Sequence, residues 1–410
     1  MKAVVFTLGC KVNEVESASI MAELERRGFE VESTLCPADI YVLNTCAVTK
    51  EAERKSRQLL SRAKKFNPNA RLYVCGCASE KDREQFLKDG VCFVGGARDK
   101  QAVIAKIASD FGGRFGGEEC ERLPYPKQVK TRAFIKIEDG CNNFCSYCVI
   151  PYLRGRVTSV AAEDVIEEIR ACTAPEIVLT GINISAYDGC EGGLSGLIER
   201  LAFTDKRVRL GSVECRVIDE RLINALKGLK NFAPQFHLSL QSGSNAVLKA
   251  MNRHYTREEY LEKCAMIYRA FPDASVTTDI IAGFCGESEE DFSQSLSLIA
   301  EAGFLRVHAF AFSPREGTKA FALKDLPAEV KSRRLHLLIE EGKRAEEKYI
   351  SARLGRTYSV ICEDFDGAYT AGYTANYIKV YIEGKAEGTV TVKLLSPFRE
   401  GVLAQQVNNF

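Results

Sequence analysis

The chain has 410 residues, 46% of them hydrophobic, and its 56 basic and 55 acidic side chains give a net charge of +1. This length predicts two or three domains. The charge balance excludes a chain that is basic throughout, so any surface that binds nucleic acid must be local. No apolar stretch reaches the roughly 18 residues that cross a bilayer, and the apolar run at the N-terminus is too short for a signal peptide. We therefore predict a cytoplasmic protein without a membrane partner.

Thiols stay reduced in that compartment, so the 16 cysteines indicate metal or redox chemistry rather than disulfides.

Residues 1–111 are predicted to form a doubly wound α/β domain with a parallel sheet. Apolar runs alternate with amphipathic stretches, the runs at 3–7, 39–45 and 71–76 and the stretches at 14–28, 50–66 and 79–90. Ligands of such sheets lie beyond the carboxyl ends of the strands. Cys10, Cys46 and Cys77 each follow such an end, so we expect these three thiols to converge on one site. Cys75 lies within the strand and is expected to point to the opposite face.

The rest of the chain divides into a linker, a second βα series and a β-rich end. Residues 112–130 are rich in glycine and contain two prolines, which predicts a linker. Residues 131–345 contain six predicted βα units, which favour a partial barrel with its active site at the carboxyl ends of the strands. Its predicted strands are 133–138, 176–181, 207–214, 235–243, 275–283 and 306–313, and its predicted helices include 161–174, 257–271 and 289–303. A long charged helix is predicted at 327–354. The last part of the chain, residues 346–410, includes the end of this helix and is predicted to form a small all-β barrel with strands at 358–362, 378–382 and 389–395.

The most specific motif is the CxxxCxxC formed by Cys141, Cys145 and Cys148, directly after the first strand of the second series. Three thiolates on one loop can bind three irons of a cubane cluster and leave the fourth iron open for a small ligand. The alternative is a structural zinc site, but such sites usually pair one CxxC with another or with histidines. The spacing therefore favours an iron–sulfur cluster.

This motif resembles that of the radical S-adenosylmethionine (SAM) superfamily. Further segments resemble the methylthiotransferases over essentially the whole chain, namely TLGCKVN at 7–13, NTC at 44–46, GCA at 76–78, EDGC at 138–141, HLSLQSG at 237–243 and SPREGT at 313–318. The final part resembles a TRAM domain, which is an RNA-binding β-barrel.

The resemblance implies SAM and two [4Fe-4S] clusters as cofactors. It assigns one cluster, which binds SAM, to Cys141, Cys145 and Cys148, and an auxiliary cluster that supplies sulfur to Cys10, Cys46 and Cys77. It also implies SAM contacts for five other residues, which are Tyr147, Gly181, Glu214, Gln241 and Gly283.

The resemblance further implies methylthio transfer to C2 of an adenosine in transfer RNA (tRNA). That carbon has an unactivated C–H bond that no side-chain base could deprotonate, whereas a carbon radical can abstract its hydrogen. TLGCKVN resembles the branch that modifies N6-threonylcarbamoyladenosine (t6A) beside the anticodon. The alternatives are the isopentenyladenosine branch, which more often reads YGCQMN, and a branch that modifies an aspartate of a ribosomal protein and reads LGCPKN. A rival of another class is a non-enzymatic RNA-binding protein with structural zinc.

The expected partners are a t6A-bearing tRNA, a low-potential electron donor and a sulfur source. Residues 50–71 carry eight basic and two acidic side chains, so this predicted helix could attract phosphates. A solvated helix face is the alternative interpretation. The RNA-binding candidates are Arg54, Lys55, Arg57, Arg62, Lys64 and Lys65.

Overall fold

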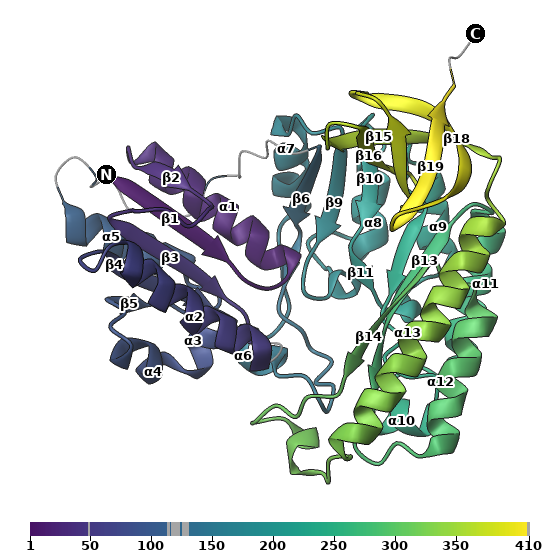
Figure 1. The fold of residues 1–410 in the computed structure, drawn as a ribbon, viewed down its shortest axis with the longest axis horizontal. Coiled ribbons are helices and arrows are strands. Elements are labelled where there is room, and N and C mark those ends of the chain that lie inside the picture. The colour runs from purple at the N-terminus through teal and green to yellow at the C-terminus, as the bar shows by residue number, and fades with distance from the viewer. Residues whose placement is uncertain (48–49, 113–114, 116–123, 125–130, 408–410) are drawn as a thin grey trace.

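The computed structural model describes residues 1–410 except 48–49, 113–114, 116–123, 125–130 and 408–410. Figure 1 shows an N-terminal α/β part, a central part of strands and helices, and a C-terminal barrel. Most of the predicted linker 112–130 lies outside the described residues. Among the helices that the structure describes, none combines the length and the apolar composition that crossing a membrane requires.

The N-terminal part is a five-stranded parallel sheet with helices on both faces, as predicted. The strand order is β2-β1-β3-β4-β5, with β1 (Lys2–Thr7), β2 (Glu30–Glu32), β3 (Ile40–Thr45), β4 (Arg71–Gly76) and β5 (Phe93–Val94). The helices are α1 (Lys11–Arg26), α2 (Lys50–Phe66), α3 (Cys77–Lys81), α4 (Arg83–Lys88) and α5 (Lys100–Phe111). Successive side chains of a strand point to opposite faces. Val42 therefore packs with α1 and α5, and Leu43 packs with α2 and α4.

The two predicted helices 14–28 and 79–90 differ from those in the structure. Helix α1 starts at Lys11, three residues earlier than expected, so Cys10 is its N-terminal cap residue. The predicted helix 79–90 is two short helices because Asp82 leaves the helical conformation (φ −115°, ψ 36°). The first of these helices begins at Cys77, directly after the positive-φ residue Gly76. Both cysteines are therefore held at helix starts.

The central part is the predicted open barrel, built from two parallel sheets. Their orders are β10-β9-β6 and β11-β12-β13-β14, with β6 (Arg132–Lys136), β9 (Glu176–Thr180), β10 (Arg207–Leu210), β11 (Ser212–Val213), β12 (Gln235–Leu238), β13 (Ser275–Ala282) and β14 (Arg306–Ala311). The predicted strand 207–214 is divided at Gly211, whose backbone N–H donates to the carbonyl of Leu179 at 2.8 Å. A Cβ on Gly211 would lie 2.8 Å from the same oxygen, so only glycine permits this approach.

Helices cover the outside of this barrel. They are α6 (Ile150–Arg154), α7 (Ala162–Ala171), α8 (Gly193–Arg200), α9 (Glu220–Lys227), α10 (Asn245–Ala250), α11 (Arg257–Ala270), α12 (Glu289–Ala302) and α13 (Ala328–Ser351), with single turns η2 (Ile184–Ala186), η3 (Cys215–Val217) and η4 (Lys319–Ala322). A short antiparallel pair is formed by β7 (Glu138–Asp139), which precedes α6, and β8 (Thr158–Ser159), which follows it. Capping boxes at Thr256 and Ser288 start α11 and α12, which explains why their predicted starts are correct.

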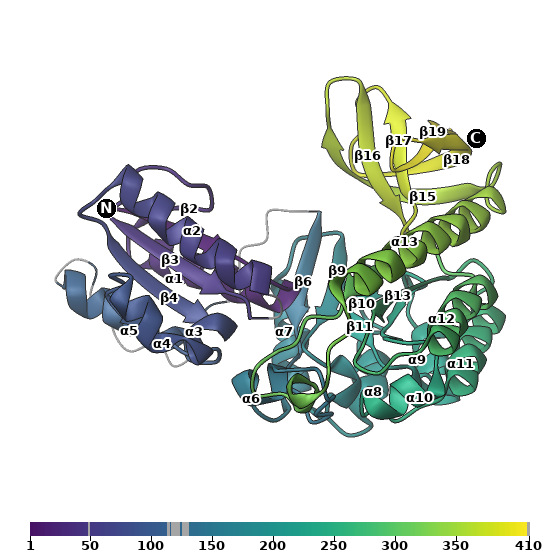
Figure 2. The same ribbon diagram turned by 60° about the horizontal axis from the view of Figure 1, so that its bottom comes forward.

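The C-terminal part is a closed five-stranded barrel in the order β15-β16-β17-β19-β18. Its strands are β15 (Thr357–Phe365), β16 (Tyr369–Thr374), β17 (Lys379–Glu383), β18 (Thr389–Phe398) and β19 (Gly401–Gln406). The sequence predicted three of them and missed β16 and β19, which contain few large apolar residues. Figure 2 shows this barrel beside the end of α13. Tyr349 and Ile350 of that helix belong to its core, which fixes it to the central part.

Candidate active site

The three cysteines of the CxxxCxxC motif lie together on the loop between β7 and α6. Cys145 is buried, and Cys141 and Cys148 are half-buried. Burial raises the pKa of the Cys148 thiol to about 12, and its two neighbouring thiols add to the rise. Burial also raises the pKa of Cys141, with a contribution from Cys145. Burial and neighbouring thiols thus favour the protonated form, and a bound cationic group would reverse this preference by stabilising the thiolates, so that binding of the group would release protons.

These thiols fit the ligand set of a cubane cluster, because such a cluster binds each cysteine through a different iron. No three His, Cys, Asp or Glu side chains within the described ranges are grouped so that they could hold one metal ion.

Polar side chains from distant parts of the chain surround this loop. Arg253 donates from Nη1 to the sulfur of Cys145 at 3.3 Å, and Asn183 donates to the sulfur of Cys141 at 3.9 Å. Arg253 also lies 3.2 Å from Glu214, which accepts a hydrogen bond from Asn143 at 2.5 Å. The structure therefore places the predicted SAM contact Glu214 beside the cysteine loop. Neither Arg253 nor Asn183 had a predicted role.

The other predicted SAM contacts differ in their surroundings. Tyr147 is half-buried and packs in a small core with Met251, Phe284 and Phe312. Gly181 is confined, because a Cβ there would lie 2.7 Å from Glu138 Oε2. Gln241 has a positive φ of 73°. The backbone N–H of Gly283 donates to Glu287 at 2.9 Å, so this amide already has a partner.

The three N-terminal cysteines follow adjacent parallel strands and lie at one edge of the sheet. Cys46 is so close to Gly9 that a Cβ on this glycine would lie 3.2 Å from the Cys46 sulfur. Cys10 and Cys77 are also neighbours, since Cys10 contributes to the raised pKa of Cys77, of which burial is the main cause. Asn13 joins the ends of β1 and β3 by donating to the carbonyls of Leu8 at 2.8 Å and Thr45 at 2.9 Å. Cys75 packs on the opposite face of the sheet, as predicted.

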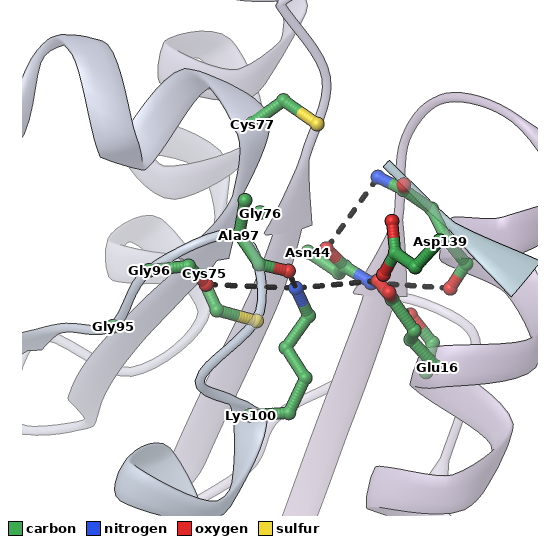
Figure 3. A network of polar contacts seen from close by, with 12 residues as sticks. Glu16, Asn44, Cys75, Gly76, Cys77, Gly95, Gly96, Ala97, Lys100 and Asp139 are labelled. Atoms are coloured by element: carbon green, nitrogen blue, oxygen red, sulfur yellow. Dashed lines mark hydrogen bonds and ion pairs between the residues drawn. The ribbon is translucent and has the colours of Figure 1, made fainter. Parts of the chain in front are cut away.

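A buried polar network connects this edge to the central part, and its centre is Arg154 of α6, which is only 1% exposed. Arg154 donates to Cys77 Sγ at 3.2 Å, to Glu16 at 2.9 Å and to Asp139 at 3.0 Å. Figure 3 shows Glu16 and Asp139 close together, with Lys100 extending toward them from the N-terminal part. The ammonium of Lys100 lies 3.2 Å from Glu16. The network lowers the pKa of Glu16 well below its usual range, because the three cations Lys100, Lys136 and Arg154 outweigh its burial.

One cavity of about 720 Å³ receives residues from all three parts of the chain. The N-terminal part contributes the segment from Gly9 to Val12, which includes Cys10, and also Glu14. The barrel contributes alternate, inward-pointing residues, which include Phe134, Thr180, His237, Thr277, Asp279, Arg306 and His308. The C-terminal barrel contributes Tyr373 and Tyr377, whose rings stack with centroids 4.7 Å apart. The cavity therefore joins an N-terminal cysteine, the barrel interior and an aromatic pair.

The RNA-binding candidates all lie on α2. Five of them are exposed, while Lys64 is half-buried and donates to the carbonyl of Asp89 at 3.2 Å. Helix α2 follows β3, and Cys46 lies in the segment between them.

The fold and the cysteine loop define the class of the protein: residues 135–299 match the radical SAM superfamily, so the chain is a radical SAM enzyme. Residues 2–95 match the uncharacterized protein family UPF0004. The chain is similar to the threonylcarbamoyladenosine tRNA methylthiotransferase MtaB of Chlamydia pneumoniae, with 39% identity over 374 residues that cover 89% of this chain and 87% of the relative. The chain belongs to the radical SAM methylthiotransferase family, whose cofactors are SAM and two [4Fe-4S] clusters.

Two further comparisons concern a second relative and the fold. A tRNA-2-methylthio-N(6)-dimethylallyladenosine synthase of Oceanobacillus iheyensis is 35% identical over 386 residues, which cover 88% of this chain and 74% of the relative. The structure of the radical SAM methyltransferase TsrM from Kitasatospora setae shares the fold, with a TM-score of 0.55, 12% identity and coverage of 76% and 74% of the two chains. The family confirms the resemblance seen in the sequence and favours the enzyme over the zinc-binding alternative.

Proposed function

We propose that this enzyme attaches a methylthio group to C2 of N6-threonylcarbamoyladenosine next to the anticodon of tRNA. The observation that carries the proposal is the shared cavity, because it brings Cys10 and the inner wall of the radical SAM barrel to one space. A base that enters this space would be near Cys10, and Gly181 of the cavity wall precedes by two residues Asn183, which donates to the sulfur of Cys141. The two stacked tyrosines add an aromatic surface of the kind on which nucleobases stack.

The reaction replaces an unactivated hydrogen, and each set of residues has a part in it. The bound cofactors would supply the carbon radical that removes this hydrogen, the sulfur that replaces it and the methyl group. Cys141, Cys145 and Cys148 would hold one cluster, and Cys10, Cys46 and Cys77 the other. Tyr147 and Glu214, which lie on or beside the cysteine loop, would contact SAM, as would Gly181, Gln241 and Gly283.

Two arginines support these ligand sets. Arg253 donates to the sulfur of Cys145, and Arg154 donates to the sulfur of Cys77. Charge-assisted hydrogen bonds of this kind stabilise an anionic sulfur and fix its orientation. The cavity walls would exclude water from the reacting carbon.

The choice of t6A rests on the TLGCKVN segment and on the substrate for which the Chlamydia pneumoniae relative is named. A relative at 35% identity carries the name of a dimethylallyladenosine synthase, so isopentenyladenosine is the second candidate substrate. The ribosomal-protein aspartate is the third.

The remaining partners follow from the chemistry. An electron donor of low potential must reduce the cluster that cleaves SAM, and a sulfur source must renew the auxiliary cluster. The exposed basic side chains of α2 and the C-terminal barrel would bind the RNA, and the reaction would take place in the cytoplasm.

The test is an anaerobic reaction of the reconstituted protein with SAM, a reductant and tRNA that carries t6A, followed by mass spectrometry of the nucleosides. A methylthio mass gain on t6A is expected. Parallel reactions with tRNA that carries isopentenyladenosine and with ribosomal protein measure the two alternatives. A gain on either alternative, without a gain on t6A, would overturn the proposed substrate.

A further inference from the structure

We propose that Lys11 binds the carboxylate of the threonylcarbamoyl substituent and so selects this substrate, an inference that rests on the function proposed above. Lys11 is the first residue of α1, directly after Cys10, and its exposed side chain lines the shared cavity. The threonine carboxylate is ionised at neutral pH, whereas a dimethylallyl substituent has no charge. A cation on the cavity wall therefore distinguishes the two.

The other cations of the cavity wall already have carboxylate partners. The distances are 2.6 Å from Arg132 to Glu176, 3.0 Å from Arg209 to Glu176 and 2.8 Å from Arg306 to Glu346. Across the described ranges of the chain, Lys11 forms no ion pair or hydrogen bond through its side chain. Its ammonium lies 5.6 Å from the centre of the Phe134 ring of β6. The ammonium group of Lys11 is therefore available to bind an anionic ligand.

Two acidic side chains share the cavity wall with Lys11. Asp279 of β13 contacts His237 Nε2 at 3.1 Å. Glu14 lies three residues further along α1, so it is a neighbour of Lys11 on the helix surface, and it is exposed. A ligand carboxylate at Lys11 would therefore be repelled by Glu14. The Glu14→Gln variant is expected to bind the t6A substrate more tightly.

The position of Lys11 also suits the geometry of adenine. The N6 substituent and C2 both lie on the edge that contains N1, so a group that recognises the substituent must be near the group that delivers sulfur to C2. Lys11 is adjacent in the chain to Cys10, a predicted ligand of the sulfur-supplying cluster. Recognition of the carboxylate at Lys11 would thus bring C2 toward that cluster.

The experiment measures anaerobic binding of anticodon stem-loop RNA to the reconstituted full-length protein by fluorescence anisotropy. Three RNAs are compared, with t6A, with its carboxylate methyl ester or with isopentenyladenosine at the modified position. Lys11→Gln is expected to weaken binding of the t6A RNA by about tenfold to a hundredfold, the range for a hydrogen bond to a charged group. Lys11→Gln should leave binding of the ester and isopentenyl RNAs unchanged, and Lys11→Arg should retain the preference for t6A. Lys230→Gln is the control, since Lys230 is exposed, does not line the cavity and pairs with Asp205.

Iron and sulfide contents equal to those of the wild type establish that each variant is folded and loaded. Equal weakening of all three RNAs by Lys11→Gln would indicate a phosphate contact and overturn the inference, as would unchanged binding of the t6A RNA. If the wild type itself shows no preference for t6A in binding or in product formation, the proposed substrate is wrong and the role of Lys11 fails with it. A wild type that modifies t6A, with a Lys11→Gln variant equally selective, overturns only the role of Lys11.

Discussion

Arg154 donates a hydrogen bond from Nε to the sulfur of Cys77 at 3.2 Å, although 76 residues lie between them in the chain. Arg154 belongs to α6, the short helix that follows Cys148 of the other cysteine set. One buried side chain therefore links the helix beside the radical cluster loop to a predicted ligand of the auxiliary cluster. The positions of the two cysteine sets depend on each other through this arginine.

Replacing Arg154 by methionine is expected to destabilise the protein by about 3–5 kcal/mol, the range for breaking a buried ion pair. Glu16 and Asp139 would lose a cation that each contacts at 2.9–3.0 Å. Urea denaturation of the cluster-free protein measures the free energy of unfolding. Arg200→Met is the control, because Arg200 and its ion-pair partner Glu163 are both exposed. Equal effects of the two substitutions would show that the buried network does not stabilise the fold.

Glu138 predicts a pH dependence of stability. Its burial raises the pKa of its carboxyl group from 4.5 to about 7, and its Oε1 has no hydrogen-bond partner in the described structure. The folded state therefore binds the proton more tightly than the unfolded chain, so this contribution to stability is complete below about pH 4.5 and is lost as the pH rises to about 7. Glu138→Gln should reduce the loss of unfolding free energy between about pH 5 and pH 7, measured by urea denaturation. A variant whose loss equals that of the wild type would contradict the raised pKa.

Cys145→Ala should abolish 5′-deoxyadenosine formation from SAM, because the loop then offers two of the three required thiolates. Chromatography of the anaerobic reaction measures the product. Cys172→Ala, which changes a half-buried cysteine at the end of α7, should retain full SAM cleavage. SAM cleavage at the wild-type rate by Cys145→Ala would refute the assignment of this cysteine as a ligand.

Cys46→Ala should retain SAM cleavage but form no methylthio product, because Cys46 belongs to the sheet edge and not to the cysteine loop. The iron content of the variant should fall by the amount that one cluster contains. Mass spectrometry of the nucleosides measures the methylthio product. Cys75→Ala is the matched control, since Cys75 lies on the opposite face of the same sheet. Persistent thiolated product from Cys46→Ala would show that the auxiliary cluster is held in another way.

Removing charge from α2 should lower the salt dependence of tRNA binding. Each phosphate contact contributes about 0.7 to 0.9 to the slope of log K against log salt, so the triple variant R57Q/R62Q/K65Q should reduce the slope by about 2 to 3. Binding constants measured at several salt concentrations give this slope. An unchanged slope would favour the solvated-face interpretation of this helix.

The order of strands and helices was predictable because apolar periodicity is a local property of the sequence. The alternation in residues 1–111 predicted the parallel sheet, and the common edge of β1, β3 and β4 then predicted that their cysteines meet. The division at Gly211 was not predictable, since it depends on the close approach of the Leu179 carbonyl from a neighbouring strand. The start of α1 at Lys11 was also missed, because its N-terminal cap residue, Cys10, makes no side-chain capping hydrogen bond and is not a residue type that marks helix starts.

The supporting residues of the candidate site could not be found from spacing. Arg253 reaches Cys145 across 108 positions of the chain, and Asn183 reaches Cys141 across 42. Neither residue has an unusual local pattern. Their contacts arise only when the carboxyl ends of separate barrel strands come together. The sequence thus predicts the ligands, which are grouped in a motif or at strand ends, more readily than the residues that orient them.

The stacked pair Tyr373 and Tyr377 has a consequence for the evolution of such chains. The two rings belong to the C-terminal barrel yet form part of the wall of the shared cavity, where Arg132 lies over both of them at 5.3 Å. Exchange of this barrel between relatives would therefore change the cavity wall, and with it the turnover that we expect the cavity to support. Recombination at the end of α13 is expected to yield active chimaeras only when the aromatic pair and its arginine are inherited together.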